Sequence, residues 1–383
     1  MKSRLDSLFD ALLPVFATLA ALLIGAIMLL ALQVNPIVAY SALFQGAFGS
    51  TNAFAETLVR ATPLLLVGLG ICIAYRGNVI NIGGEGQMIM GALASVWIGI
   101  NLTGLPGWVV IILGLLAGTI VGCIWGGIAG FLKAYFNVNE ILSTVMMNAI
   151  AVQFKNFYLT GPLMDPAQAE MASQIPQSAR LEDIFRLPRI LMPTRLHFGS
   201  VIAVALAILV YILLWRTTLG YRIRAVGQNP HASKYAGIKV KHYIVLALLL
   251  SGALAGLAGA VQVYGVNYRM ITDGSPTGFT GGSGFNGIVA ALFGQLHPIL
   301  TIPASVLFGA LIVGANAMQR ATQIPSALIT ALNGLVVVFV VSSEIWRKQR
   351  QKKRLTVVEV EGKVVEAKYA DDLSDTTNDE ENA

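Results

Sequence analysis

Residues 108–131 read WVVIILGLLAGTIVGCIWGGIAGF and contain no charged side chain. This length exceeds the roughly 18 apolar residues that a helix needs to cross a bilayer. In lipid the backbone has to pair its own polar groups, so an apolar run of this length predicts a helix. Small residues at every fourth position leave one face smooth enough for another backbone to approach closely. They are Gly114, Gly118, Gly122, Gly126 and Gly130.

Further apolar segments lie on both sides of this one. Their bounds are residues 12–32, 57–75, 82–100, 141–158, 198–215, 242–263, 287–296, 299–318 and 324–345. The composition is 55% hydrophobic and 12% charged, whereas soluble domains hold about 25% charged residues. The predicted fold class is therefore an all-α integral membrane protein of about ten transmembrane helices. Residues 287–296 are too short to span and predict a half-helix or re-entrant element.

The sequence also contains a candidate internal repeat. A helix, a break rich in glycine and asparagine, and another helix occur at residues 57–100 and again at residues 242–318. The number of spans between the two segments would orient them oppositely, which predicts an inverted repeat. Gly252 and Gly256 give the second segment a smooth face of its own, for which helix packing is the expected use.

The net charge of +6 is divided unevenly along the chain. After Arg354 there are nine acidic residues and two lysines, so residues 1–354 hold 24 basic and 11 acidic groups. We expect residues 1–354 to form one polytopic transmembrane domain and residues 355–383 a disordered acidic cytoplasmic tail. Most of the basic residues fall in loops on one side, which predicts a plasma-membrane protein with both termini cytoplasmic. The basic body suits anionic lipid headgroups, and no nucleic-acid partner is expected.

Residues 76–87, RGNVINIGGEGQ, interrupt apolar sequence with amides, glycines and a carboxylate. Polar groups at membrane depth are costly and usually face a cavity or a partner helix, and an interrupted helix frees backbone groups that can meet a polar solute. On this reasoning the candidate substrate-pathway residues are Asn78, Asn81, Glu85, Asn148 and Asn286. The alternatives are an ordinary turn in which the helix dipole stabilises Glu85, and a hydrogen bond from Asn148 to another helix.

The sequence predicts no catalytic residue, no metal site and no cofactor. It has no phosphate loop of the GxxxxGK[ST] type, so ATP hydrolysis is not expected of this chain. Residues 282–287, GSGFNG, match a dinucleotide fingerprint but open a short membrane helix instead of following a strand. Cys72 and Cys123 lie inside apolar runs, and the histidines lack metal-ligand partners at suitable spacing.

The most informative polar stretch is residues 220–238, GYRIRAVGQNPHASKYAGI. Asn229 followed by Pro230 is typical of a helix start, and Gly237 is typical of a helix stop. The pattern therefore predicts a helix of about two turns between them. A basic loop that lies on lipid headgroups is the alternative interpretation.

This stretch resembles the coupling segment of ABC importer permeases of the branched-chain amino acid, ribose and nucleoside group, through its RAVGxNP core and the later AGI. Residues 78–86, 139–148 and 284–298 resemble further signatures of that group. The similarity covers residues 61–346 and is greatest to the longer of the two permeases in nucleoside importers. Ser233, where alanine is common, and the acidic tail depart from the pattern.

The resemblance implies a permease subunit of an ATP-binding-cassette importer that translocates nucleosides. Its implied partners are a separate ATPase subunit, a second permease in a heterodimer, an extracytoplasmic solute-binding lipoprotein and membrane lipid. It implies that the ATPase is coupled through Arg222, Arg224, Gly227, Asn229, Pro230, Ala232, Ala236 and Gly237. Ribose or another simple sugar is an alternative solute. An ion-coupled secondary transporter is an alternative class, which would use buried carboxylates such as Glu85 or Glu140.

Overall fold

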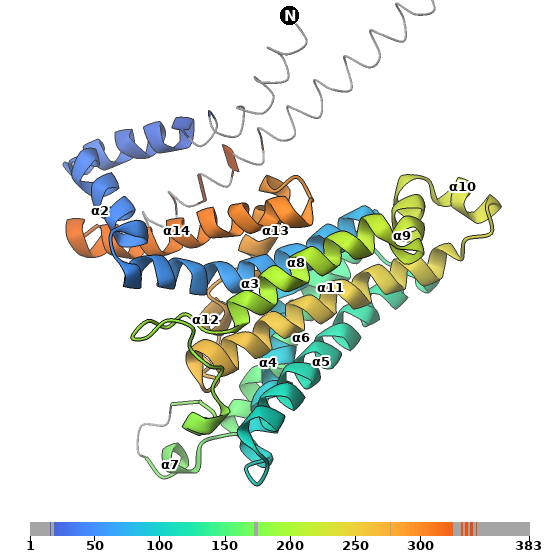
Figure 1. Cartoon of the computed structure of the whole chain (residues 1–383), viewed down its shortest axis with the longest axis horizontal. Coiled ribbons are helices and arrows are strands. Elements are labelled where there is room, and N and C mark those ends of the chain that lie inside the picture. The colour runs from blue at the N-terminus through green and yellow to red at the C-terminus, as the bar shows by residue number, and fades with distance from the viewer. Residues whose placement is uncertain are drawn as a thin grey trace, which may run out of the picture. The chain divides into compact units, whose positions relative to one another are not determined.

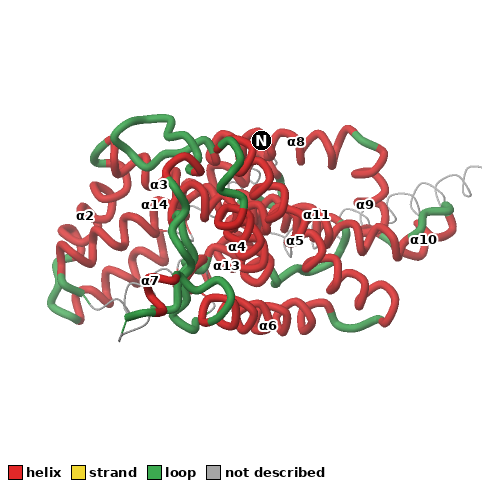
Figure 2. Tube along the Cα trace, turned by 90° about the horizontal axis from the view of Figure 1, so that it is seen from below, coloured by secondary structure: helices red, strands yellow, loops and turns green. Residues whose placement is uncertain are grey.

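The computed structural model describes residues 19–171, 175–275 and 277–324, together with residues 16, 331, 334, 335, 338, 339 and 342. Within these residues the regular elements are helices joined by loops (Figures 1 and 2). The chain divides into two compact units, one of Leu29–Asn333 and one of Met1–Met28 with Gly334–Ala383. In the second unit, residues 19–28 are helical.

Nine helices pack together in the unit Leu29–Asn333, as far as the structure describes it. They are α2 (Pro36–Phe48), α3 (Thr51–Arg76), α4 (Gly84–Asn101), α5 (Gly107–Phe136), α6 (Glu140–Thr160), α8 (Gly199–Arg216), α11 (Val240–Gln262), α13 (Ser283–Phe293) and α14 (Pro298–Thr322). A π-helical turn, Val263–Asn267, continues α11. The elements that connect them are α7 (Pro166–Ala169), a 3-10 turn (Asp183–Phe185), α9 (Thr218–Gln228), α10 (Pro230–Tyr235) and α12 (Thr277–Thr280).

Five helices of the described residues are long and apolar enough to cross a membrane, namely α3, α5, α8, α11 with its π-helical turn, and α14. This confirms an all-helical polytopic membrane protein. The predicted short element near residue 287 is confirmed as α13, which has 11 residues. Of the first and last predicted segments, residues 12–15, 17 and 18 and most of 325–345 lie outside the described residues.

The glycine face of α5 packs on α11, as its spacing predicts. The positions buried on α5 are mostly glycines, whereas large side chains of its other face, such as those of Ile120 and Ile124, are exposed as expected of a lipid-facing surface. A Cβ on Gly122 would lie 2.5 Å from the carbonyl oxygen of Gly252 and 2.5 Å from the Cα of Gly256. The two backbones are therefore in direct contact, and no side chain fits between them.

Helix α3 lies at the centre of the unit. In its most apolar window 89% of the residues are buried, against 28% for α5 and for α8. Its small residues allow the close approach of its neighbours, because Gly68 faces the carbonyl of Gly287 on α13 and Gly70 faces Ser251 on α11. The polar break that follows α3 is thus held inside the bundle by packing on several sides.

Two described helices of more than ten residues, α2 and α9, were not predicted from the sequence. Helix α2 has only 13 residues, which is below the length of a membrane span, and it begins where Asn35 accepts a hydrogen bond from the N–H of Ile37. Helix α9 covers the first half of the stretch 220–238, for which only the later helix was expected. Thr217 caps α9, and its apolar residues Ile223 and Val226 are buried, which stabilises a helix there.

Candidate functional site

The polar break predicted between the second and third apolar segments is present between α3 and α4. Helix α3 ends at Arg76, and α4 begins at Gly84. Asn78 has a φ of 56°, in the left-handed region that asparagine tolerates better than most residues, and its side chain is exposed. Asn78 therefore turns the chain at the edge of the site, and its local role is that of a turn residue.

Asn81 is at the centre of the break and is almost fully buried. Its Nδ2 donates to Oγ of Ser251 on α11 at 2.8 Å and to Oε1 of Gln87 at 3.0 Å. Its Oδ1 accepts from the N–H of Gly83 at 2.9 Å and from Nε2 of Gln87 at 3.1 Å. The amide is thus satisfied by protein groups and ties the break to α11.

Asn148 on α6 binds the backbone of the same break. Its Oδ1 accepts from the N–H of Gly86 at 2.8 Å, and its Nδ2 donates to the carbonyl of Ile82 at 3.0 Å. One turn earlier, Oγ1 of Thr144 accepts from the N–H of Ile82 at 3.3 Å. These are hydrogen bonds from Asn148 to another helix, which the sequence analysis gave as the alternative to solute contact. They satisfy backbone groups that have no partner where the helix is interrupted.

Glu85 joins the N-termini of two helices. It lies in the first turn of α4, is fully buried, and its Oε1 accepts from the N–H of Gly284 at 3.0 Å and of Phe285 at 3.3 Å, in the first turn of α13. The two backbones meet here, because a Cβ on Gly84 would lie 3.3 Å from the Cα of Gly284. The carboxylate therefore faces the positive ends of two helix dipoles, which stabilise its charge.

Asn286, the fifth predicted pathway residue, is half-buried on α13. Within the described residues its side chain has no hydrogen-bond partner, unlike those of Asn81 and Asn148. It lies directly after the backbone N–H groups that bind Glu85. Of the predicted amides that are buried or half-buried, it is therefore the one that is free to bind a solute.

Lys155 is a buried residue that the sequence analysis did not single out. It lies on α6 seven residues after Asn148, which places both on one helix face. Its side chain is fully buried, and its Nζ donates to the carbonyl of Ser275 at 2.9 Å. In the sequence, only the spacing of seven residues from Asn148 indicated that Lys155 could lie on the buried face of the helix. A lysine near the end of an apolar run is more simply interpreted as a surface residue.

The loop that receives Lys155 carries a compact turn. Asp273 accepts hydrogen bonds from the backbone N–H and the hydroxyl of Ser275. The bond from the N–H of Ser275 is the main cause that holds the pKa of the Asp273 carboxyl below its usual value. In the next contact, Thr272 donates to Asn156 of α6. The charged turn is thus fixed to the end of α6 at two successive residues, Lys155 and Asn156.

The predicted two-turn helix in the stretch 220–238 is present as α10, which is joined to α9 at Asn229. Oδ1 of Asn229 accepts from the N–H of Ala232 at 3.0 Å, Pro230 is the first helical residue, and Gly237 has a φ of 79° after the helix end. The side chain of Ser233 is buried. Ala232 and Ala236 are exposed, although Ala236 follows the last turn of α10 instead of lying within it.

The predicted coupling residues also include two arginines with different surroundings. Arg222 is exposed and its Nη1 donates to the hydroxyl of Tyr243 at 3.0 Å. Arg224 and Arg76 both lie over the ring of Trp215, at 5.8 and 5.2 Å from its centroid. Arg224 is therefore part of the packing between α9 and the end of α3, whereas Arg222 faces a pocket.

Gly227 brings the coupling stretch into contact with the polar break. A Cβ on Gly227 would lie 2.9 Å from the carbonyl carbon of Arg76 and 3.0 Å from the amide nitrogen of Asn78. Only hydrogen fits at this place. The end of α9 thus rests directly on the turn that leads from α3 to Asn81, and the structure brings the predicted coupling and pathway residues together through the backbone.

Comparison with known proteins extends these observations. Residues 53–341 match the model of the family described as the permease component of the branched-chain amino acid transport system. The chain belongs to this permease family. The guanosine ABC transporter permease protein NupP of Bacillus subtilis (strain 168) is 36% identical over 90% of this chain and 95% of its own length.

Two further relatives of this permease differ in the solute that they are named for. The glucose ABC transporter permease protein TsgB13 of Haloferax volcanii is 33% identical and covers 88% of each chain. The nucleoside ABC transporter permease protein NupB of Lactococcus lactis subsp. cremoris is 31% identical over 86% of this permease and 90% of its own length. The resemblance seen in the sequence motifs is thereby confirmed at the level of the family.

Proposed function

We propose that this permease is a subunit of an ABC importer that translocates nucleosides across the plasma membrane. The observation that carries the proposal is the near full-length similarity to a permease named for guanosine. A simple sugar is the second candidate, because a relative named for glucose covers almost as much of the chain. The expected partners are an ABC ATPase, a second permease in a heterodimer and an extracytoplasmic solute-binding lipoprotein.

An uptake assay with the reconstituted transporter tests the solute. We expect ATP-dependent uptake of labelled guanosine, competed by unlabelled nucleosides and not by glucose or ribose. Ionophores should have little direct effect, whereas inactivation of the ATPase should stop uptake. An ion-coupled mechanism is disfavoured because Glu85 binds backbone N–H groups and Glu140 forms an ion pair with Lys133 at 2.9 Å. ATP-dependent uptake of labelled glucose, with no uptake of labelled guanosine, would favour the sugar.

In this proposal the polar groups around the break shape the pathway and the half-buried Asn286 contacts the solute. The full domain, residues 1–354, has about ten spans, and the segments 57–100 and 242–318 form an inverted repeat. The meeting of the N-termini of α4 and α13 at Glu85 supports a repeat, since each is the helix that follows a break in its own segment. The predicted cytoplasmic tail, residues 355–383, lies outside the described residues.

Removal of the Glu85 carboxylate tests the role of this junction. In Glu85→Ala the N–H groups of Gly284 and Phe285 lose their acceptor, at a cost of about 1–3 kcal/mol for each unpaired buried group. We expect uptake per folded molecule to fall at least about tenfold. Glu85→Gln keeps an acceptor and should retain more activity.

Glu182→Ala, which removes an exposed acid in the loop before α8, is the matched control and should transport normally. Uptake is measured alongside the amount of folded protein from size-exclusion chromatography. Normal uptake by Glu85→Ala, with wild-type amounts of folded protein, would place the pathway elsewhere.

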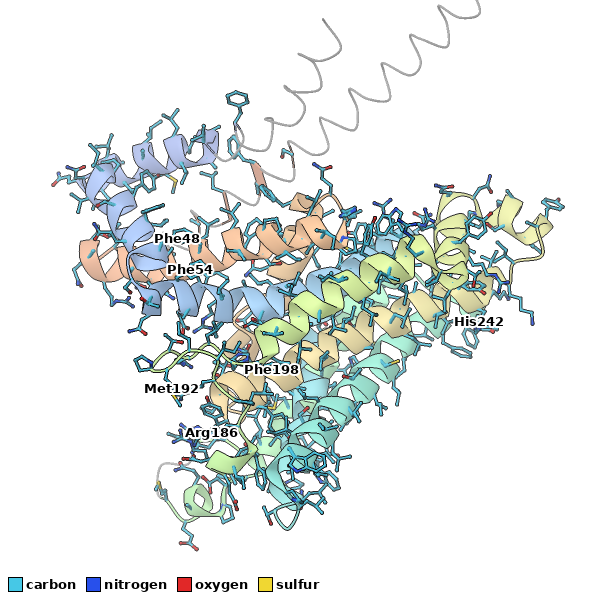
Figure 3. The ribbon with its side chains drawn as sticks, viewed as in Figure 1. Phe48, Phe54, Arg186, Met192, Phe198 and His242 are labelled. Atoms are coloured by element: carbon cyan, nitrogen blue, oxygen red, sulfur yellow. The ribbon has the colours of Figure 1, made fainter. Side chains whose placement is uncertain are left out.

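The orientation of the permease is a further prediction. Arg186 and His242 lie at opposite ends of the unit (Figure 3), and Arg186 is held over the ring of Tyr268 at 4.4 Å. We propose that both chain termini are cytoplasmic, on the basis of the bias of basic residues. Single cysteines at positions 239 and 353 should then be labelled only from the cytoplasm, and a cysteine at position 186 only from outside. Outward labelling at position 239 would overturn the orientation and the coupling proposal together.

A further inference from the structure

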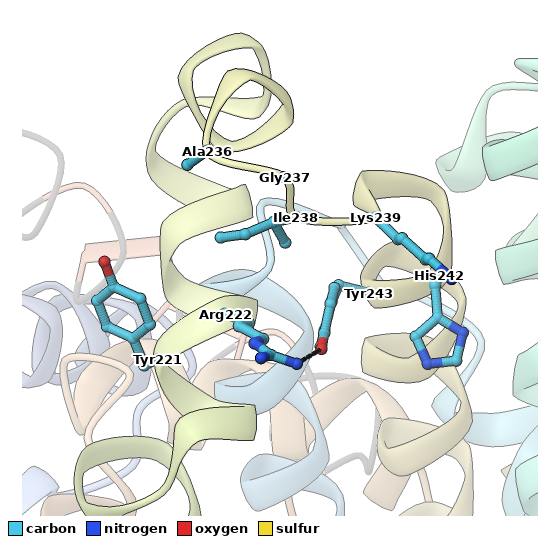
Figure 4. Close-up of a pocket in the computed structure, with 8 residues that line it drawn as sticks. All are labelled: Tyr221, Arg222, Ala236, Gly237, Ile238, Lys239, His242 and Tyr243. Carbon is cyan, nitrogen blue, oxygen red and sulfur yellow. Dashed lines mark hydrogen bonds between the residues drawn. The ribbon is translucent and has the colours of Figure 1, made fainter.

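A pocket of about 560 Å³ opens between α9 and the start of α11 (Figure 4). Three basic side chains line it: Arg222 from α9, Lys239 from the residue before α11, and His242 from the first turn of α11. Figure 4 shows Arg222 directed across the pocket toward Tyr243, to whose hydroxyl it donates at 3.0 Å. The pocket is therefore large enough for a small polar group, and Arg222 and Lys239 give it positive charge.

The charges in this pocket have no acidic partner in the part of the chain that the structure describes. None of the ion pairs formed there involves Arg222, Lys239 or His242. The bond from Arg222 to a neutral phenol leaves the other guanidinium N–H groups available, and a guanidinium binds a phosphate with two parallel hydrogen bonds. An uncompensated cluster of this kind attracts an anion.

The backbone at the N-terminus of α11 also favours a bound anion. Helix α11 has 23 residues and begins at Val240, and no side chain caps its N-terminus at Lys239. The free N–H groups of a first turn and the positive end of the helix dipole both favour a bound anion. This end of a long helix opens into the pocket beside the basic side chains.

The pocket lies at the level where apolar helices end. Helix α8 ends at Arg216 and α11 begins at Val240, so both cross from this level into apolar sequence. Lys241 lies over the ring of Tyr135 at 5.2 Å, and Tyr135 packs on Phe131 at the end of α5. Aromatic side chains at helix ends are typical of the headgroup region of a bilayer, where basic pockets between helices receive anionic lipid.

We propose that this pocket binds the phosphate of an anionic phospholipid, with Arg222 and Lys239 as the main contacts. The lipid would be held between α9 and α11, beneath the residues that follow α10. It would therefore brace the coupling stretch from the membrane side. The proposal does not depend on the solute that the permease carries.

Lipid retention by the full-length protein provides the test. The purified permease in detergent is mixed with equal amounts of dioleoyl phosphatidylglycerol and dioleoyl phosphatidylcholine, and bound lipid is counted by native mass spectrometry. We expect the wild type to retain phosphatidylglycerol selectively. Arg222→Ala/Lys239→Ala should lower its affinity about 10- to 30-fold, since two basic contacts with the phosphate are lost at the membrane surface.

Arg216→Ala/Lys234→Ala removes two exposed cations of neighbouring helices that do not line the pocket, and it should retain the lipid as the wild type does. Should the double variant not fold, the single exposed change Lys239→Glu takes its place. Equal retention by wild type and pocket variant would overturn the proposal. Selective binding of inorganic phosphate in place of the lipid by the wild type would also overturn it. So would unchanged lipid binding by the pocket variant together with loss of ATPase copurification, because this result would assign the pocket to carboxylates of the ATPase.

Discussion

Gly256→Leu is expected to leave almost no folded permease. A Cβ at position 256 would lie 2.7 Å from the Cα of Gly122, where the backbones of α5 and α11 are in contact. Neither backbone can move away without breaking the packing of the whole pair, and over-packing of a tight core costs about 1–3 kcal/mol even for small additions. For a leucine we expect a loss above about 4 kcal/mol, which a membrane protein of ordinary stability does not survive.

The amount of protein that elutes as a single peak after detergent extraction measures this effect. Gly104→Leu is the matched control, because a Cβ there meets no atom within 4 Å. Gly256→Ala should fall between the two. Wild-type yield and thermal stability of Gly256→Leu would mean that α5 and α11 do not pack through their glycine faces.

Ala236→Trp and Ala232→Trp are expected to abolish ATP-dependent uptake while the protein still inserts and folds. Ala232 in α10 and Ala236 directly after it are both exposed, so a large side chain at either position should not disturb the fold. If α10 docks into a groove of the ATPase, an indole at position 232 or 236 keeps the two surfaces from coming into close contact. A loss of about 3 kcal/mol of docking free energy reduces the complex roughly 100-fold.

Copurification of the ATPase with each variant is the decisive measurement, accompanied by uptake and by the yield of folded permease. Thr103→Trp, in the exposed loop between α4 and α5, introduces the same side chain away from α10 and should retain the complex. Full retention of both complex and transport by the Ala232 and Ala236 variants would show that α10 is not the coupling element.

The helices that the sequence predicted well are those whose pattern is local. Residues 108–131 combine an uninterrupted apolar run with glycines four apart, so both the span and its packing face could be predicted, and α5 confirms them. Asn229, Pro230 and Gly237 likewise mark the limits of α10. Helix α2 was missed because 13 apolar residues without a full span length are not distinguishable from a loop segment by hydropathy alone.

The site was predicted as a set of residues but not as a network. Asn148 and Gly86 are 62 residues apart in the chain, and Glu85 and Gly284 are 199 apart. No local pattern specifies such pairings, because they depend on which helix faces meet. The same reason explains Lys155, whose buried position follows from the loop at Ser275, 120 residues away. The polar character of the break could be predicted from the sequence. Its hydrogen-bond partners are determined by the packing of α6, α11 and α13 and could not be predicted.

The contact of Gly227 with the turn at Arg76 and Asn78 has a mechanical meaning. A side chain between two moving parts can bend or change rotamer and so absorb part of a displacement, whereas two touching backbones have no such slack. Three residues further on, Asn81 is bonded to Ser251 of α11. A displacement of α10 would therefore be transmitted to α3, α4 and α11 without being absorbed by side-chain motion. In the proposed transport cycle, closure of the ATPase and rearrangement of the polar network would then be one event instead of two in sequence.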